Sequence, residues 1–303
     1  MKLLMLFTVF TPTFNRRHTL LRLFESLEAQ TFRDFEWLVI DDGSTDGTGE
    51  LLHELESRAS FPLRYQYQSN AGKHVASNRA VDLAAGQLFT TLDSDDALLP
   101  HSLRRMADHW WSISHDRRHE FSGVTCLCQR QDGTILGDSF PASASAKGVL
   151  DSDPITMMVF GITGDKWGFH ATDIMRQYRF PEFEGERFIP EGLVWNRIGS
   201  KYGIRYVNEP LRRVYFDERD CLSRRSIEIR SRSPRGAQLF YLEQSRFAPT
   251  TLLKYKALIN YIRFSLHGGL SIDLTPSTVA LFPAGLAMWL RDRRALKRGL
   301  AAV

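Results

Sequence analysis

Residues 35–47 read FEWLVIDDGSTDG, an apolar run that turns abruptly into acidic, glycine and hydroxyl residues. The run Phe35–Asp41 has the length and composition of a strand that is buried on both faces. Leucines then recur at helical spacing, so we expect a helix to begin near Asp46. A buried strand followed by a helix is the repeating unit of a parallel α/β sheet.

The same alternation continues to about residue 111. We expect strands at residues 3–11, 35–41, 63–68 and 87–93. We expect helices around residues 20–27, from 46 onward, and at 75–85 and 100–111. This pattern predicts a doubly wound, mostly parallel sheet, whose ligands bind beyond the carboxyl ends of the strands.

The later part of the chain is less regular. Residues 121–130 and 134–137 flank Asp132-Gly133, which predicts a hairpin. A strand at 166–172 and a helix at 190–202 follow. From about Pro234 onward the pattern is helical, with a loop at Gly268-Gly269.

The composition is that of a globular protein, with 303 residues, 43% of them hydrophobic and 24% charged. The net charge of +4 is too mild to argue for nucleic acid as a partner. Basic residues nevertheless gather in two stretches: Arg224, Arg225, Arg230, Arg232 and Arg235, and then Arg291, Arg293, Arg294, Lys297 and Arg298. Such clusters attract phosphates or anionic lipids, and the plainer alternative is a solvated surface.

The cysteines Cys126, Cys128 and Cys221 are odd in number and wrongly spaced for a zinc site. We therefore predict reduced thiols in a cytoplasmic protein. The apolar N-terminal run resembles a signal peptide, but no small-residue cleavage site follows it. We interpret it as the first strand.

Three carboxylates lie in the stretch Asp93-Ser94-Asp95-Asp96, after the fourth expected strand. They repel one another unless a cation lies among them, and Mg²⁺ or Mn²⁺ prefers such oxygen ligands together with substrate phosphates. The alternative is that Asp95 or Asp96 caps the following helix.

A second acidic stretch, residues 41–47, follows the second expected strand. One of its carboxylates could accept hydrogen bonds from a nucleobase or ribose. The alternative is a turn in which Asp46 caps the next helix. The spacing of the acidic residues does not fit an EF-hand.

Four motifs together resemble the family 2 glycosyltransferases, which have the GT-A fold. They are residues 12–16 (PTFNR), 41–48 (DDGSTDGT), 70–73 (NAGK) with 78–80 (NRA), and 93–96 (DSDD). The resemblance implies a catalytic domain over residues 1–215, in which 1–100 bind the nucleotide sugar and 101–215 the acceptor. Residues 216–303 form a helical C-terminal region.

The resemblance also implies roles for single residues. Pro12, Thr13 and Asn15 would lie at the nucleotide, Asp42 would bind the base, and Lys73 would lie near the diphosphate. Asp95 would be a direct ligand of Mn²⁺ or Mg²⁺, with Asp93 beside it and nearer the ribose. Enzymes of this family invert the anomeric centre in one displacement, which requires a general base and no covalent nucleophile.

We predict Glu191 as that base, because the family places an acid at the start of a helix in this region. A helix N-terminus favours the ionised carboxylate that a base needs. The alternative is that Glu191 only interacts favourably with the helix dipole at this position. Asp165 is the second candidate for the base. No QxxRW motif is present, which favours transfer of one sugar at a time. Arg212, Arg213 and Arg224 are candidates for neutralising the diphosphate.

Residues 274–290 carry no charge over 17 positions, fewer than the roughly 20 needed to span a bilayer. With the basic cluster that follows, residues 274–303 predict a peripheral contact with the inner face of a membrane. Packing on the catalytic domain or on a second subunit is the alternative. The expected partners are a nucleotide-sugar donor, UDP-sugar first, and a glycan or lipid-linked acceptor.

Three other functions compete with this one. A sugar nucleotidyltransferase would show a glycine-rich signature after the first strand, and residues 11–17 contain no glycine. A phosphatase with an aspartyl nucleophile would carry its DxD after the first strand, not the fourth. A degenerate transferase that only binds nucleotide or carbohydrate is disfavoured by the intact Asp42, Asp93, Asp95 and Glu191.

Overall fold

The computed structural model describes residues 5–141, 148–216 and 226–297. The chain divides into two compact units: Met1–Arg179 with Lys201–Tyr215, and Phe180–Ser200 with Phe216–Val303. Our predicted boundary at residue 215 therefore differs in one segment, because Phe180–Ser200 joins the helical unit. Within that unit Arg197 forms a two-pronged ion pair with Glu243, with N–O distances of 2.8 and 2.6 Å.

The first unit is built on a nine-stranded sheet in the part of the chain that the structure describes. Its strands are β1 (Phe7–Thr13), β2 (Phe35–Asp41), β3 (Leu63–Tyr67), β4 (Leu88–Thr91), β5 (Ala97–Leu98), β6 (Phe121–Gln129), β7 (Val149–Ser152), β8 (Lys166–Ala171) and β9 (Gly203–Arg213). Its helices are α1 (Arg17–Glu28), α2 (Thr48–Arg58), α3 (Lys73–Leu83), α4 (Ser102–Trp111), α5 (Pro154–Met157) and α6 (Thr172–Gln177), with short 3-10 turns η1 (Arg118–Glu120) and η2 (Met158–Phe160).

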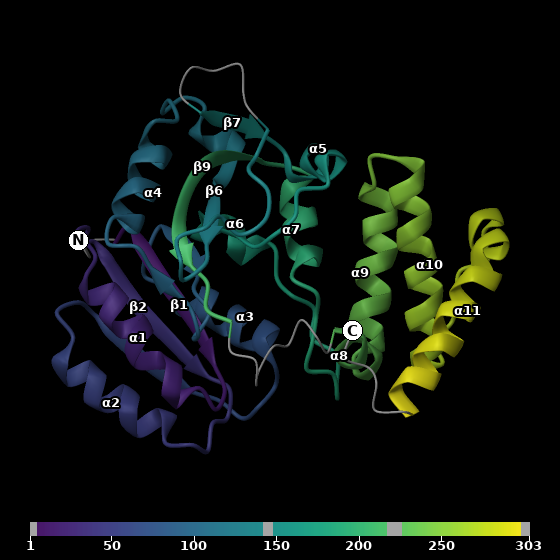
Figure 1. The fold of residues 1–303 in the computed structure, drawn as a ribbon, viewed down its shortest axis with the longest axis horizontal. Coiled ribbons are helices and arrows are strands. Elements are labelled where there is room, and N and C mark those ends of the chain that lie inside the picture. Colours follow the sequence, from purple (N-terminus) through teal and green to yellow (C-terminus); the bar gives the residue numbers. More distant parts are fainter. Residues whose placement is uncertain (1–4, 142–147, 217–225, 298–303) are drawn as a thin grey trace. The chain divides into compact units, whose positions relative to one another are not determined.

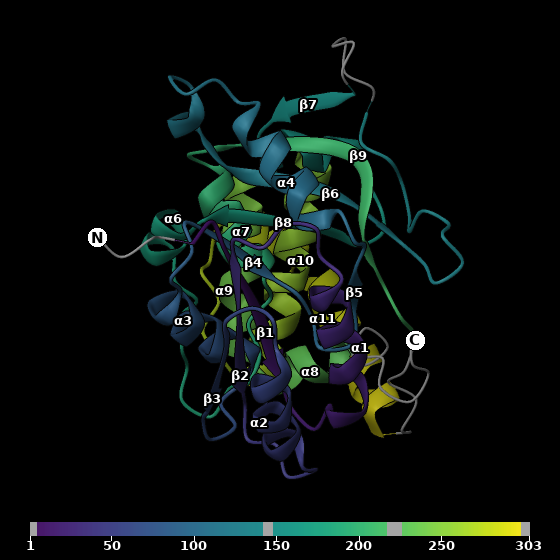
Figure 2. The same cartoon turned by 90° about the vertical axis from the view of Figure 1, so that its left-hand side faces the viewer.

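The strand order is β3-β2-β1-β4-β8-β6-β9-β5, and β7 pairs with β9. The first four strands of this order are parallel, as predicted. β8 runs antiparallel between β4 and β6. Helices α1 and α2 lie on one face of the parallel strands and α3 on the other (Figure 2). The sheet is thus mixed, and its parallel half brings the ends of β1, β2, β3 and β4 to one edge.

Burial explains why the parallel half folds as the sequence predicts. Every residue of β2 is buried, and Phe24 of α1 packs against Trp37 at 6.2 Å between ring centroids. Glu36 is the only acid of β2 other than Asp41, its last residue. Its carboxylate forms hydrogen bonds and an ion pair with neighbouring elements of the protein. It accepts hydrogen bonds from the Thr8 hydroxyl at 2.6 Å and the Ala85 N–H at 2.7 Å. Arg64 pairs with its second oxygen at 3.0 Å.

Most predicted strands are found, and one is not. β2 has its predicted bounds, and β3, β4 and β8 lie inside their predicted ranges. β1 begins at Phe7, later than predicted. The predicted turn at Asp132-Gly133 is present, but the hairpin around it is short. An isolated antiparallel bridge joins Gln129 to Ile135, and the Leu136 N–H donates to the Cys128 carbonyl at 2.9 Å. Beyond it the Asp138 N–H donates to the Thr163 carbonyl at 3.0 Å.

The second unit is helical, as predicted for the C-terminal region. It contains α7 (Gly192–Gly199), α8 (Ser226–Arg232), α9 (Pro234–Phe247), α10 (Thr251–Gly268) and α11 (Pro276–Lys297). α10 lies between α9 and α11 (Figure 1). α11 continues through Pro283, although a proline inside a helix usually kinks or breaks it. Within the described residues, no helix combines the length and apolar character needed to cross a bilayer.

Candidate active site

The loops that follow β1 and β2 are tied together by Asn15. Its side-chain oxygen accepts a hydrogen bond from the Thr45 N–H at 2.8 Å, and its own N–H donates to the Ser44 hydroxyl at 2.8 Å. Asn15 has a φ of 53°, a left-handed conformation that asparagine tolerates better than most residues. Asp46 adds a further tie by accepting from the Arg17 N–H at 3.1 Å. Asn15 therefore shapes the rim on which the other predicted residues lie.

Asp42 organises the loop that follows β3. Its buried carboxylate accepts hydrogen bonds, each 2.8 Å long, from the Gln68 side chain and from the N–H groups of Ala71 and Gly72. A carboxylate offers about four acceptor positions, so roughly one remains for a ligand. Gly72 has a φ of 100°, which favours glycine at that turn. The residue predicted to bind the base is thus also the anchor of the loop that carries Lys73.

A polar pocket of about 300 Å³ opens beside the end of β2. Asp41 lines it, and its carboxylate accepts from the Ser44 N–H at 2.8 Å and the Tyr65 hydroxyl at 3.1 Å. Partial burial and the neighbouring Asp41 charge raise the pKa of Tyr65 to about 12, so the hydroxyl keeps its proton at neutral pH. This pocket lies next to Asp41 rather than to Asp42.

Lys73, the first residue of α3, forms an ion pair with Asp93, which lies in the loop after β4. The Lys73 Nζ lies 2.7 Å from the Asp93 Oδ1. Burial by itself would raise the pKa of Asp93, but the charges of Lys73 and Arg212 hold it below its ordinary value. Asp93 is therefore ionised at neutral pH and sits in a positive environment.

The pKa values of Asp95 and Asp96 are shifted in the opposite direction from that of Asp93. Burial, with the Asp93 charge added, raises the pKa of Asp95. Burial raises the pKa of Asp96 to about 7, even though Arg212 opposes the shift. Neither aspartate caps the next helix, because the N-cap of α4 is His101. The capping alternative is thus excluded.

The donor set fits a hard divalent cation. Asp93 and Asp95 offer carboxylate oxygens, which Mg²⁺ and Mn²⁺ prefer. Residues 5–141, 148–216 and 226–297 contain no group of three or more His, Cys, Asp or Glu side chains arranged for a metal. A cation here would therefore take one or two protein ligands and complete its shell with water and substrate phosphates, which is the usual habit of Mg²⁺.

Arg212 is the functional residue whose place the sequence did not reveal. It is 8% exposed on β9, and its Nη1 lies 3.4 Å from Asp96 and 4.0 Å from Asp93. Its Nη2 lies 3.9 Å from Asp165. The pairing of Leu98 with Arg212 brings this strand next to the aspartates. That pairing joins residues far apart in the chain, so no local pattern could have signalled it.

Arg22 and Tyr215 hold the same aspartate loop from another side. An Arg22 Nη2 N–H donates to the Asp95 carbonyl, and its guanidinium stacks 3.7 Å from the centroid of the Tyr215 ring. The Tyr215 N–H donates to Asp96 Oδ1 at 3.3 Å. Sequence reasoning missed both residues, because each acts on a motif distant from it in the chain.

The remaining predicted residues are placed as follows. Thr13 is buried at the end of β1, and its hydroxyl has no hydrogen-bond partner among the described residues, which leaves it free for a ligand. Pro12 is half-buried next to it. Glu191 is the exposed N-cap residue of α7, in the helical unit. Arg224 and Cys221 lie outside the described residues, while Cys126 and Cys128 are buried free thiols on β6.

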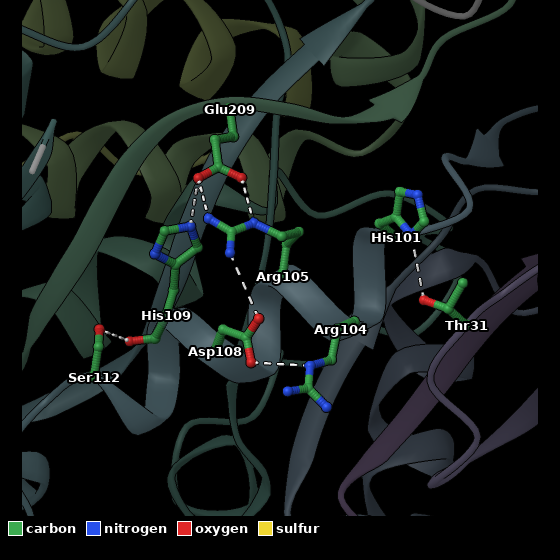
Figure 3. Close-up of polar contacts among 8 residues, drawn as sticks. All are labelled: Thr31, His101, Arg104, Arg105, Asp108, His109, Ser112 and Glu209. Atoms are coloured by element: carbon green, nitrogen blue, oxygen red, sulfur yellow. Dashed lines mark hydrogen bonds and ion pairs between the residues drawn. The ribbon is translucent and has the colours of Figure 1, made fainter.

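A salt-bridge cluster braces α4 against β9, the strand that carries Arg212 (Figure 3). Glu209 accepts hydrogen bonds from Arg105 Nε at 2.9 Å and Nη2 at 2.7 Å, and from His109 Nε2 at 2.9 Å. Bonds from His109 and then Arg105 lower the pKa of Glu209 to about 2. The cluster joins α4 to β9 at Glu209, three residues before Arg212.

Comparison with known proteins bears on the family and the fold. The glycosyl transferase family 2 model matches residues 8–116. The GalNAc(5)-diNAcBac-PP-undecaprenol β-1,3-glucosyltransferase of Campylobacter jejuni is 35% identical over 211 residues, which cover 68% of this chain and 63% of that protein. The chain spans between 32% and 63% of the length of the first curated relatives that it matches.

Two solved structures have the same fold. Staphylococcus aureus TarS 1–349 in complex with UDP-GlcNAc superimposes with a TM-score of 0.61 at 17% identity, covering 97% of this chain and 92% of that one. The mannosyltransferase PcManGT of Pyrobaculum calidifontis, in complex with GDP-Man and Mn²⁺, gives 0.54 at 16% identity, covering 97% and 83%. The predicted GT-A arrangement, a mixed α/β sheet with a helical C-terminal part, is confirmed.

Proposed function

Because this chain belongs to the family 2 glycosyltransferases, we propose that it transfers one sugar from a nucleotide-diphosphate sugar, a UDP-sugar first, to an acceptor hydroxyl. The observation that carries the proposal is the meeting of Lys73, Asp93 and Arg212 next to Asp95 at one edge of the sheet. A nucleotide diphosphate with a metal ion requires basic side chains for its phosphates and carboxylates for the metal, and both are found here.

In this proposal the residues of the aspartate loop, Asp93 to Asp96, and the cations beside it have different roles. Asp95, with Asp93 beside it, would hold Mn²⁺ or Mg²⁺. The bound ion would supply Lewis-acid stabilisation of the leaving diphosphate. Lys73 lies close enough to Asp93 to exchange that carboxylate for a phosphate oxygen. Arg212 keeps the loop compact while the charges around it change.

Glu191 would act as the general base. An exposed carboxylate at the start of α7 can take the proton of the acceptor hydroxyl as that oxygen attacks the anomeric carbon. A single displacement of this kind inverts the anomeric centre and requires no covalent nucleophile. Asp165, which is 64% exposed and near Arg212, is the second candidate.

The acceptor proposed is a glycan or lipid-linked molecule of the cell envelope, at the cytoplasmic face of a membrane. The Campylobacter relative bears the name of an enzyme acting on an undecaprenol-linked sugar, and the TarS structure contains UDP-GlcNAc. These names support the class of donor and acceptor proposed here, and the identity of the sugar is a matter for experiment.

The test is a titration of UDP with Mn²⁺, followed by a screen of UDP-, GDP- and TDP-sugars for hydrolysis. Wild type should bind UDP and hydrolyse one donor class, and Asp95→Ala should lose both activities. Asp34→Ala, an exposed aspartate just before β2, is the matched control and should behave as wild type. Binding without turnover would indicate a degenerate transferase, and formation of a nucleotide sugar from a sugar phosphate would indicate a nucleotidyltransferase.

A further inference from the structure

One face of α11 is fixed against α10. Thr278, Gly285 and Asp292 are its buried residues, seven positions apart, so they form a single stripe along the helix. At Gly285 a Cβ would lie 2.5 Å from the Ile262 side chain, so glycine lets the two helices come close. This contact and the one between Arg263 and Asp292 show that the two helices run in the same direction.

The opposite face of α11 is apolar and uncovered. Val279 is 58% exposed and Leu290 is 42% exposed. The other exposed residues of this face as far as Leu290 are Pro276, Ala280, Pro283, Ala284 and Ala287. No charged residue occurs between Pro276 and Leu290. A helix that is apolar all round is normally covered on every side by protein or lipid, and here the described residues of the chain cover only one side.

The end of α11 is cationic at the surface. Arg291, Arg293, Arg294 and Lys297 are all exposed. The only acid of the helix, Asp292, is 1% exposed and points inward. It pairs with Arg263 Nη2 at 2.6 Å and lies 3.1 Å from His267 Nε2. The surface charge of this last stretch is therefore entirely positive.

We propose that this face of α11, defined as the exposed residues from Val279 to Lys297, lies flat on an anionic lipid bilayer. Its apolar part, from Val279 to Leu290, is about 18 Å long at 1.5 Å per residue, shorter than the roughly 30 Å of a bilayer core, so it lies on the surface rather than across it. Exposed apolar side chains enter the acyl boundary while the adjacent cations meet lipid phosphates. The positive charge selects anionic lipid over a neutral apolar partner.

The binding test uses the full chain, without donor or metal, and pelleted vesicles. The vesicles contain either phosphatidylcholine alone or phosphatidylcholine with about 30% phosphatidylglycerol. The chain should pellet with the anionic vesicles at low salt and should be released as salt is raised, because screening weakens the attraction. Absence of binding to anionic vesicles at low salt overturns the proposal.

A matched pair of substitutions locates the surface. Val279→Glu should weaken binding about tenfold, since it removes the burial of one valine. Val159→Glu is the control, because Val159 is 56% exposed and lies in the other unit. Arg291→Gln with Arg294→Gln should weaken binding by about fivefold per cation. These residues are exposed, so folding should persist, and circular dichroism checks it.

The other occupant of this face would be a second copy of the chain. Light scattering without vesicles distinguishes it: a wild-type dimer that Val279→Glu separates would overturn the lipid proposal, as would equal vesicle binding by both valine variants. Because the assay uses no nucleotide sugar, its result stands apart from the proposed transfer reaction. A chain that binds vesicles but transfers no sugar would refute only the latter.

Discussion

The Lys73 Nζ lies 2.7 Å from the Asp93 Oδ1, which joins the loop after β3 to the loop after β4. The two residues are also held from behind, since Asp42 anchors the Lys73 loop and Arg212 faces Asp93. A lysine that neutralises the aspartate can turn to a phosphate when a nucleotide binds. The pair is thus both a structural contact and part of the candidate site.

Lys73→Met should weaken the binding of UDP by about tenfold or more, because a charge-assisted contact contributes about 1.5–3 kcal/mol. Lys73→Arg should retain most of the affinity, since it keeps the charge. Calorimetric titration of UDP in the presence of Mn²⁺ measures both. Equal affinities for wild type and Lys73→Met would show that the lysine does not contact the diphosphate.

Glu191→Gln should retain UDP binding and lose transfer by about a hundredfold or more, since a general base contributes about 10²–10⁴-fold. The amide keeps the size of the side chain but cannot take a proton. Glu182→Gln, an exposed acid of the same segment, is the control and should transfer normally. Normal transfer by Glu191→Gln would show that Glu191 is not the general base, and Asp165→Asn would then be the variant to test.

Arg212→Met should lower the free energy of unfolding by about 3 kcal/mol, because it leaves the carboxylate of Asp96 buried without its cation. Combining it with Asp96→Asn should restore most of the loss, since the buried charge of Asp96 is then removed together with its cation. Urea denaturation of the two single variants and the double variant measures the coupling. Additive losses would mean that the two side chains do not interact.

Glu209 should make stability depend on acid pH. Its folded pKa is about 2, below its ordinary value of 4.5, so the unfolded state binds more protons between these values. The stabilisation is present above about pH 4.5 and is lost as pH falls toward about 2. Partial exposure limits it to about 1–2 kcal/mol.

Urea denaturation at neutral pH and near pH 3, for wild type and Glu209→Gln, tests this pH dependence. The variant should be less stable at neutral pH and should lose less stability on acidification. If acidification lowered the free energy of unfolding equally in both proteins, other carboxylates would account for the pH dependence.

Local signals in the sequence were enough for the parallel half of the fold. The apolar run of β2 and the leucines of α2 each act over a few residues, and the acidic and glycine breakers lie where parallel strands must end. The order of the loops along one sheet edge follows from that alternation. The sequence therefore predicts that Asp42, Lys73, Asp93 and Asp95 lie on the same edge of the sheet.

Distant contacts decided what local patterns left open. The Asp132-Gly133 turn predicted a hairpin, and the structure shortens it to one bridge, with Asp138 bonded to Thr163 beyond it. The segment from Phe180 to Ser200 groups with the helical unit, where Arg197 pairs with Glu243. Hydrogen bonds between residues this far apart leave no trace in sequence spacing.

The amino-acid sequence by itself determined the alternating strands and helices, the acidic loops at their ends, and the apolar and basic character of the C-terminal helix. Only the tertiary structure decided in which direction individual charged side chains point. It turned Arg212 inward toward Asp93 and Asp96, and it buried Asp292 against Arg263 so that the end of α11 shows only cations. The physical reason is that periodicity reports which face of an element is apolar, whereas the partner of a buried charge is set by whichever distant strand or helix packs against it.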